Sequence, residues 1–182
     1  MKNLLCLVVL VACVGALSQA QDFIAVQAEI AEPTDAFRQS AGTGYGVKAT
    51  YMHFLSSHLA LSGSGGYTRW GSRSDVVPFN DYSIVSVPVL LGGHLLLSRG
   101  VVAPYAGVEL GLNYLHERGT APNTTASVNE SEIRFVLRPH VGVGVHVAGP
   151  LGVLLTGSYN VIYTRLTPSK FFALSIGIAA SL

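Results

Sequence analysis

Charge is scarce in this sequence. Charged residues account for 12% of the 182 residues and apolar residues for 49%, and the formal net charge is +1. Soluble domains carry about 25% charged residues, so apolar side chains are expected to cover part of the outer surface. The chain contains no cluster of Lys and Arg, which argues against a positively charged groove for nucleic acid.

Long apolar runs are also rare. The run Leu4–Leu17 is followed by Ser18 and Ala20, the small residues that a signal peptidase needs at positions −3 and −1. The run is shorter than the about 20 residues of a membrane-spanning helix. We therefore expect residues 1–20 to be a removable signal peptide and residues 21–182 to form a single domain.

Cysteine is confined to this leader, at Cys6 and Cys13. The remaining domain would have no thiol, which excludes a disulfide framework and a cysteine metal site. One alternative stays open, because Leu10 to Cys13 resembles a lipoprotein lipobox in which Cys13 would be acylated.

After the leader, hydrophobicity alternates with a period of two, and no helical pattern is found. The clearest example has Ile133, Phe135 and Leu137 on one face and Arg134 and Arg138 on the other. Alternation of this kind is typical of a β-strand. It predicts eight strands, at about residues 22–31, 44–54, 59–70, 83–97, 104–116, 133–147, 151–163 and 171–182.

The connections between these strands alternate in length. Short turns are expected at residues 55–58, 98–102 and 148–150, and longer loops at residues 32–43, 71–82, 117–132 and 164–170. If both termini lie on one side, all the short turns fall on that side and all the long loops on the other. Barrels of the bacterial outer membrane have this asymmetry, with short periplasmic turns and longer external loops.

The composition of the two faces indicates which one points outward. One face is bulky and apolar, whereas the other carries Gly, Ser, Thr and a few charges, which suits a narrow barrel interior. Tyr45, Tyr114 and Tyr163 share the apolar face near the long loops, where aromatic rings meet lipid headgroups. We therefore expect an all-β fold, an eight-stranded antiparallel up-and-down transmembrane β-barrel. The alternative is a soluble ligand-carrying barrel with its apolar face inward.

Repeated local patterns strengthen this interpretation. The sequence Gly44-Tyr45-Gly46-Val47 opens one strand, Pro104-Tyr105-Ala106-Gly107-Val108 follows a short turn, and an alternating strand ends the chain. Over about residues 22–182, the chain resembles the small eight-stranded outer-membrane β-barrel family, which includes the membrane domain of outer-membrane protein A and outer-membrane protein X. The resemblance implies an outer-membrane location, lipid contacts, and assembly by the barrel-assembly machinery through the C-terminal strand. The chain ends in Leu182, where the family often has Phe.

Several ionisable side chains fall on the polar face and are expected to line the interior. Counting along adjacent strands places Glu109 beside Arg138 and Glu29 beside Lys48, which predicts two ion pairs because isolated charges in a narrow interior are unfavourable. The expected interior network is Glu29, Lys48, Glu109, Arg134, Arg138 and His140. It would be either a static polar core or the gate of a narrow pore.

Two kinds of chemistry have weaker support in the sequence. His140 and His146 share a face, but six residues of strand separate them by about 20 Å, so they cannot bind one metal ion together. His116 and Ser131 resemble the histidine and serine of lipid-modifying barrel hydrolases. However, the alternation places His116 on the lipid face, and Ser131 is expected in a loop. Neither a metal nor another cofactor is expected.

The sequence thus predicts a non-enzymatic protein of the bacterial outer membrane. Its lumen would be filled by polar side chains, and its external loops would serve structural or interaction roles with a partner that the sequence does not identify. A narrow pore or carrier for small or hydrophobic solutes is the alternative, and a lipid-modifying barrel enzyme is a third hypothesis.

Overall fold

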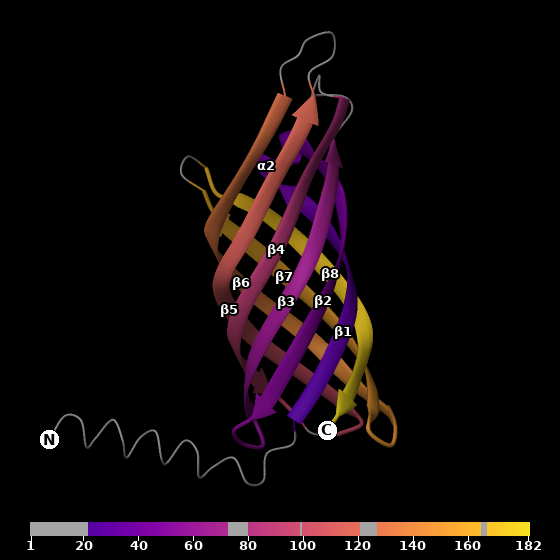
Figure 1. Ribbon diagram of the computed structural model, residues 1–182. Helices are drawn as coiled ribbons and strands as arrows, with labels where there is room; N and C mark the ends of the chain where they lie inside the picture. The colour runs from indigo at the N-terminus through magenta and orange to yellow at the C-terminus, as the bar shows by residue number, and fades with distance from the viewer. Residues whose placement is uncertain (1–21, 73–79, 99, 121–126, 165–166) are drawn as a thin grey trace, which may run out of the picture.

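The computed structural model describes residues 22–72, 80–98, 100–120, 127–164 and 167–182. The expected leader, residues 1–20, lies outside these described residues. Within the described residues, eight strands and one short helix follow each other (Figure 1). Their bounds are β1 Asp22–Thr34, α2 Phe37–Ser40, β2 Ala41–Phe54, β3 Leu59–Ser72, β4 Asn80–Leu96, β5 Val102–Thr120, β6 Ser127–Ala148, β7 Leu151–Tyr163 and β8 Ser169–Ser181.

The strands form a closed barrel. Each strand pairs antiparallel with the next along the chain, and β8 pairs with β1 to close the sheet. The expected eight-stranded up-and-down β-barrel is therefore confirmed. Closure leaves no free sheet edge around the barrel wall, so the backbone N–H and C=O groups of the wall are paired with one another.

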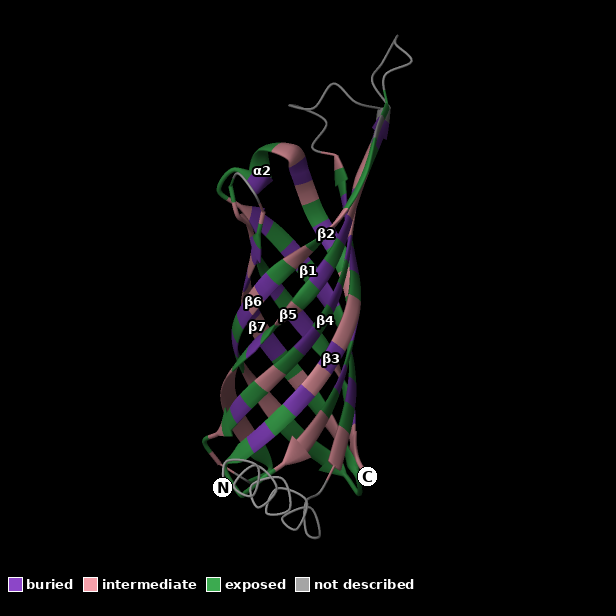
Figure 2. Cartoon of the chain, turned by 60° about the vertical axis from the view of Figure 1, so that its left-hand side comes forward, coloured by how far each residue is buried: buried purple, intermediate pink, exposed green. Residues whose placement is uncertain are grey.

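The two faces of the sheet are arranged as the sequence predicted. Bulky apolar residues point outward and are exposed, for example Val89, Leu91 and Ile178, each with 66–69% of its surface exposed. Small and polar residues point inward, so buried and exposed residues alternate along the strands (Figure 2). Lipid accepts such an apolar outer face. Among the described residues, no helix is long and apolar enough to cross a membrane.

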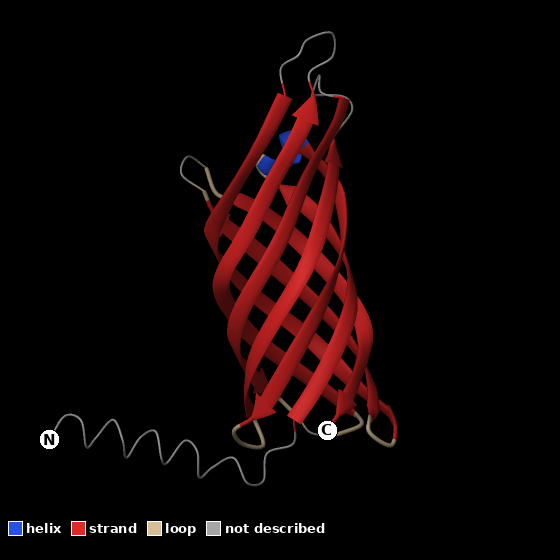
Figure 3. Ribbon diagram, viewed as in Figure 1, coloured by secondary structure: helices blue, strands red, loops and turns tan. Residues whose placement is uncertain are grey.

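The long-loop end differs from the expectation in two respects. Residues 117–132 were expected to form a loop, but β5 continues to Thr120 and β6 begins at Ser127, with Glu117 paired to Glu130. Cross-strand pairing therefore continues although the hydrophobic alternation has ended. The expected loop at residues 32–43 contains the helix α2 (Figure 3). A single helical turn is too short to be stable alone, so tertiary contacts must hold it.

Those contacts come from an aromatic cluster inside the long-loop end of the barrel. The ring of Phe37 in α2 packs edge-on against Trp70, with centroids 5.4 Å apart, and Trp70 packs similarly against Phe171 at 5.1 Å. Buried apolar side chains from most of the strands surround these rings. The cluster also includes Ala31, Ala41, Ile84, Leu90, Leu115, Val136, Ile162 and Ala173. This end of the interior is therefore an apolar core.

Candidate functional site in the barrel interior

Four charged side chains occupy the barrel interior next to the apolar core. Glu29, Lys48, Glu109 and Arg138 are all buried, with 1–7% of their surface exposed. The guanidinium of Arg138 lies between two carboxylates, 3.8 Å from Glu29 Oε2 and 3.9 Å from Glu109 Oε2. Because β1 and β6 are not neighbours in the sheet, the Glu29–Arg138 ion pair crosses the lumen.

Hydroxyl groups hold the two carboxylates in place. Ser64 donates a hydrogen bond of 2.9 Å to Glu109 Oε1. Thr68 and Ser175 each donate one of 3.2 Å to Glu29, one to each carboxylate oxygen. Hydrogen bonds to ionised carboxylates are stronger than those between neutral groups. These hydroxyls therefore fix the orientation of both carboxylates.

Arg138 has a further partner on β7. Its Nε donates a hydrogen bond to the side-chain oxygen of Asn160, whose amide nitrogen donates to Ser158 at 3.1 Å. Together with the carboxylate contacts, these bonds connect Arg138 to β1, β5 and β7. A single guanidinium thus links several strands across the interior.

The ion pairs agree only in part with those expected. Glu109 and Arg138 are opposite each other on β5 and β6, as the sequence predicted. Glu29 was expected beside Lys48, but it is opposite Gly46, while Lys48 is opposite Gln27. The carboxylate of Glu29 therefore reaches across the lumen to Arg138. No ion pair within 4.0 Å among the described residues includes Lys48.

Arg134 was also expected in this network, but the structure places it elsewhere. It faces the interior nearer the long-loop end, is partly exposed, and forms an ion pair with Glu132 on the same strand. Side chains two residues apart on a strand share a face, so this local pair forms without any contact to the central charges.

Histidines form a second polar cluster, on the short-turn side of the ionic network. His94 Nε2 lies 2.7 Å from Ser62 Oγ, and His94 Nδ1 lies 3.0 Å from His140 Nε2. His140 Nδ1 lies 3.4 Å from the carbonyl oxygen of Arg138. All four ring nitrogens therefore have polar neighbours. Within the described part of the chain, no three His, Cys, Asp or Glu residues are grouped so that they could hold a metal ion.

His116 and Ser131 lie closer together than the sequence suggested. Ser131 belongs to β6 rather than to a loop, directly opposite His116 on β5. Ser131 Oγ lies 2.9 Å from His116 Nδ1 and accepts a 2.9 Å hydrogen bond from the Tyr114 hydroxyl. In a serine nucleophile, a third group normally orients the histidine. Among the described residues, no carboxylate forms a hydrogen bond with His116.

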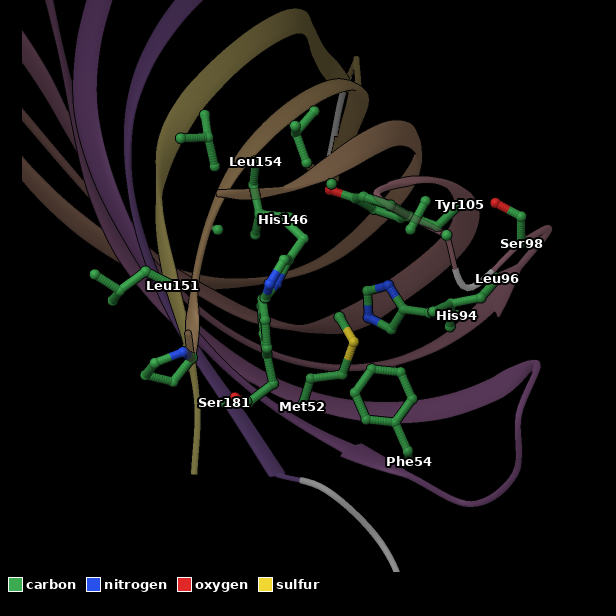
Figure 4. A pocket seen from close by; sticks show the side chains of 18 of the residues that line it. Met52, Phe54, His94, Leu96, Ser98, Tyr105, His146, Leu151, Leu154 and Ser181 are labelled. Atoms are coloured by element: carbon green, nitrogen blue, oxygen red, sulfur yellow. The ribbon is translucent and has the colours of Figure 1, made fainter. Parts of the chain in front are cut away.

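The short-turn end of the interior is open. A cavity of about 410 Å³ lies there, with Asp22, Ser98, Gly149 and Pro150 among the residues near its mouth. His94 and Tyr105 line its inner end, and Figure 4 shows the side chains of Met52 and Phe54 projecting into it. The sequence had no signal for this cavity, because its lining comes from several strands.

Similarity to known proteins identifies the family of this chain. Residues 4–177 match the family model described as the outer membrane protein beta-barrel domain. The chain belongs to this family of outer-membrane β-barrels. Family members lie in the bacterial outer membrane, and the apolar outer face of the barrel therefore contacts lipid. No curated protein sequence matches the chain.

Solved structures of outer-membrane β-barrels share the fold at low sequence identity. Neisserial surface protein A is 16% identical with a TM-score of 0.64, covering 91% of this chain and 100% of that chain. OprG from Pseudomonas aeruginosa is 13% identical with a TM-score of 0.61, covering 89% and 96%. The attachment invasion locus protein Ail of Yersinia pestis, solved with the heparin analogue sucrose octasulfate, is 15% identical with a TM-score of 0.58, covering 90% and 99%.

Proposed function

We propose that this protein is a non-enzymatic, non-conducting barrel that anchors an external β-hairpin in the outer membrane for contact with a partner. The observation that carries this proposal is the filling of the interior. The apolar core around Trp70 occupies the long-loop end, and the charged layer of Glu29, Glu109 and Arg138 lies beneath it. Water and ions would need a continuous polar path through the interior, and these two layers block such a path.

The hairpin formed by the outer parts of β5 and β6 supports the second half of the proposal. β5 has 19 residues and β6 has 22, whereas β7 and β8 have 13 each. These two strands, together with the start of β4, which pairs with β5 as far as Thr120, rise beyond the other strands at the long-loop end (Figure 1). Pairing between β6 and β7 begins at Phe135 and Tyr163, so no described strand pairs with residues 127–134 on that side. Such an edge can pair with an extended segment of another protein.

Conductance measurements test whether the interior is filled. Purified barrel in planar lipid bilayers is expected to produce no stepwise current, because the ion pairs and the aromatic rings leave no passage. A narrow pore, the alternative function, would instead give discrete steps whose size changes when Glu109 is replaced by glutamine. Steps of that kind would contradict the proposal.

Shortening the hairpin tests whether it stabilises the barrel or projects from it for contact with a partner. In this variant residues 118–129 are removed, and an Asn-Gly turn joins Glu117 to Glu130, the next pair down. The barrel is expected to keep its heat-modifiable gel migration and to lose less than about 1 kcal/mol of unfolding free energy, since the change is confined to the outer end. A loss of several kcal/mol would mean that the hairpin stabilises the barrel instead of projecting from it.

The chain reaches the outer membrane by export and barrel assembly. The leader is removed after Ala20, and the alternating C-terminal strand β8 is the segment that the barrel-assembly machinery binds. A mature N-terminus at Gln21 would support this route, whereas a mature chain that begins at an acylated Cys13 would point to a lipoprotein.

A further inference from the structure

A cavity with mostly apolar walls opens at the short-turn end of the barrel. Its volume of about 410 Å³ lies within the about 300–1,000 Å³ typical of small-molecule sites. The larger apolar side chains of the walls come from β1, β2, β4 and β7, and they are Phe23, Met52, Phe54, Leu96 and Leu154. The apolar part of a ligand can therefore be buried here, on the periplasmic side of the charged layer.

A much smaller chamber adjoins the inner end of this cavity. Its volume is about 20 Å³, enough for one water-sized group. The boundary between the two spaces consists of side chains that line both, namely Phe23, Met52, His94, Tyr105 and Leu154. The remaining lining of the chamber is mostly polar, and it includes Lys48, Thr50, Glu109 and His140. The two spaces together are apolar near the mouth and polar at the inner end.

Several polar groups at this inner end already bond to one another. The Tyr105 hydroxyl lies 2.6 Å from Thr156 Oγ1, which also accepts a 2.9 Å hydrogen bond from the Gln27 amide. Both ring nitrogens of His94 have polar neighbours, at 2.7 and 3.0 Å. None of these groups needs a ligand to complete its hydrogen bonds.

Two buried oxygen atoms on residues that line the chamber have no hydrogen-bond partner. They are Oε2 of Glu109 and Oγ1 of Thr50, on residues that are 1% and 7% exposed. Glu109 Oε2 needs a donor, because Ser64 bonds to Oε1 and the guanidinium of Arg138 is 3.9 Å from Oε2. The Thr50 hydroxyl can donate or accept. Buried polar atoms without partners are unfavourable, so a group that donates to Glu109 and accepts from Thr50 would stabilise both.

The charges around the chamber are formally balanced. Lys48 and Arg138 supply two buried cations, and Glu29 and Glu109 supply two buried anions. A carboxylate of a ligand would be repelled by Glu109, and an ammonium would be repelled by Lys48 and Arg138 after losing its own hydration. The head group that fits is therefore neutral, about the size of a water molecule, and able both to donate and to accept. A hydroxyl group has all three properties.

We propose that this cavity binds a neutral amphipathic alcohol. Its hydroxyl group enters the chamber, where it donates a hydrogen bond to Glu109 Oε2 and accepts one from the Thr50 hydroxyl. Its apolar tail lies between Phe23, Met52 and Leu154. The charged layer closes the inner end, so the ligand binds without crossing the barrel. The binding site is distinct from the external hairpin and does not depend on a partner there.

Methionine labelling allows a direct test with 1-octanol and its isomer heptyl methyl ether, which has no hydroxyl donor. The domain contains a single methionine, Met52, in the cavity wall, and a single tryptophan, Trp70, at the opposite end. In phospholipid nanodiscs, octanol is expected to shift the ¹³C-methyl signal of Met52 saturably while the Trp70 indole signal stays in place. The Kd for octanol should be about tenfold lower than that for the ether, because the ether cannot donate to the charged carboxylate. Octanoate should bind more weakly than octanol.

Two variants separate head-group binding from partitioning into lipid. Thr50→Val should raise the Kd for octanol about fivefold, and it should fold normally because the hydroxyl that it removes has no partner in the protein. The control Thr43→Val, at an exposed position of the same strand near its outer end, should leave the Kd unchanged. Ala103→Phe places a ring in the cavity and should abolish the saturable shift for octanol and for the ether.

Three results would overturn the proposal. Equal affinities of the wild-type protein for octanol and the ether would mean that no hydroxyl group of the ligand bonds to Glu109. Octanoate that binds as tightly as octanol would contradict the requirement for a neutral head group. A Met52 shift that rises linearly with each probe and survives Ala103→Phe would mean that the probes act from the surrounding lipid, and no cavity site would exist.

Discussion

Replacing Arg138 with methionine is expected to lower the free energy of unfolding by about 3–5 kcal/mol. The side chain is 3% exposed and lies within 4 Å of the carboxylates of both Glu29 and Glu109. Without it, the two buried acids retain only Lys48 as a nearby cation, and removal of one partner from a buried ion pair typically costs this much. Urea unfolding in lipid vesicles, followed by the fluorescence of the single tryptophan Trp70, measures the change.

Two companion variants make this result specific. Arg134→Met removes a guanidinium on the same strand that pairs with the partly exposed Glu132, and its unfolding curve should stay close to that of the wild type. Adding Glu109→Gln to Arg138→Met should recover part of the lost stability, because one uncompensated charge disappears. If Arg138→Met and Arg134→Met unfold alike, water reaches the charged layer and the interior is not filled as proposed.

Replacing Gly177 with alanine is expected to impair closure of the barrel. Gly177 on β8 is opposite Gln27 on β1, at the seam where the last strand meets the first. An added Cβ would lie inside van der Waals contact of the Val26 carbonyl oxygen, 2.5 Å from Gln27 Cα and 2.8 Å from Gln27 Cγ. Backbone cannot yield as a flexible side chain can, so the expected loss is about 3 kcal/mol or more of unfolding free energy. The heat-modifiable fraction on unboiled gels should fall with it.

The neighbouring strand supplies the control for this prediction. A Cβ at Gly157 on β7 would meet no atom within 4 Å, so Gly157→Ala should fold and migrate like the wild type. Equal migration of both variants would show that β1 and β8 can separate enough at this point to accept a methyl group.

The sequence alone determined the barrel fold and its membrane environment. Alternation with period two identified all eight strands, and the lengths of the connections separated an end with short turns from an end with long loops. These signals are local, because a strand that is buried on one face and lipid-exposed on the other must alternate at each residue. The centre of β3, Gly63 to Gly66, has no apolar side chains, so the alternation there does not indicate which face points outward.

Only the tertiary structure decided which interior side chains meet. Adjacent-strand counting found Glu109 beside Arg138, but it could not find the contact between Glu29 and Arg138, which crosses the lumen. It also missed the helix α2, whose Phe37 is held by Trp70, and the cavity beneath His94. Contacts across a barrel depend on its closure, on the stagger between strands and on side-chain reach. The alternation along a single strand gives no information about any of these.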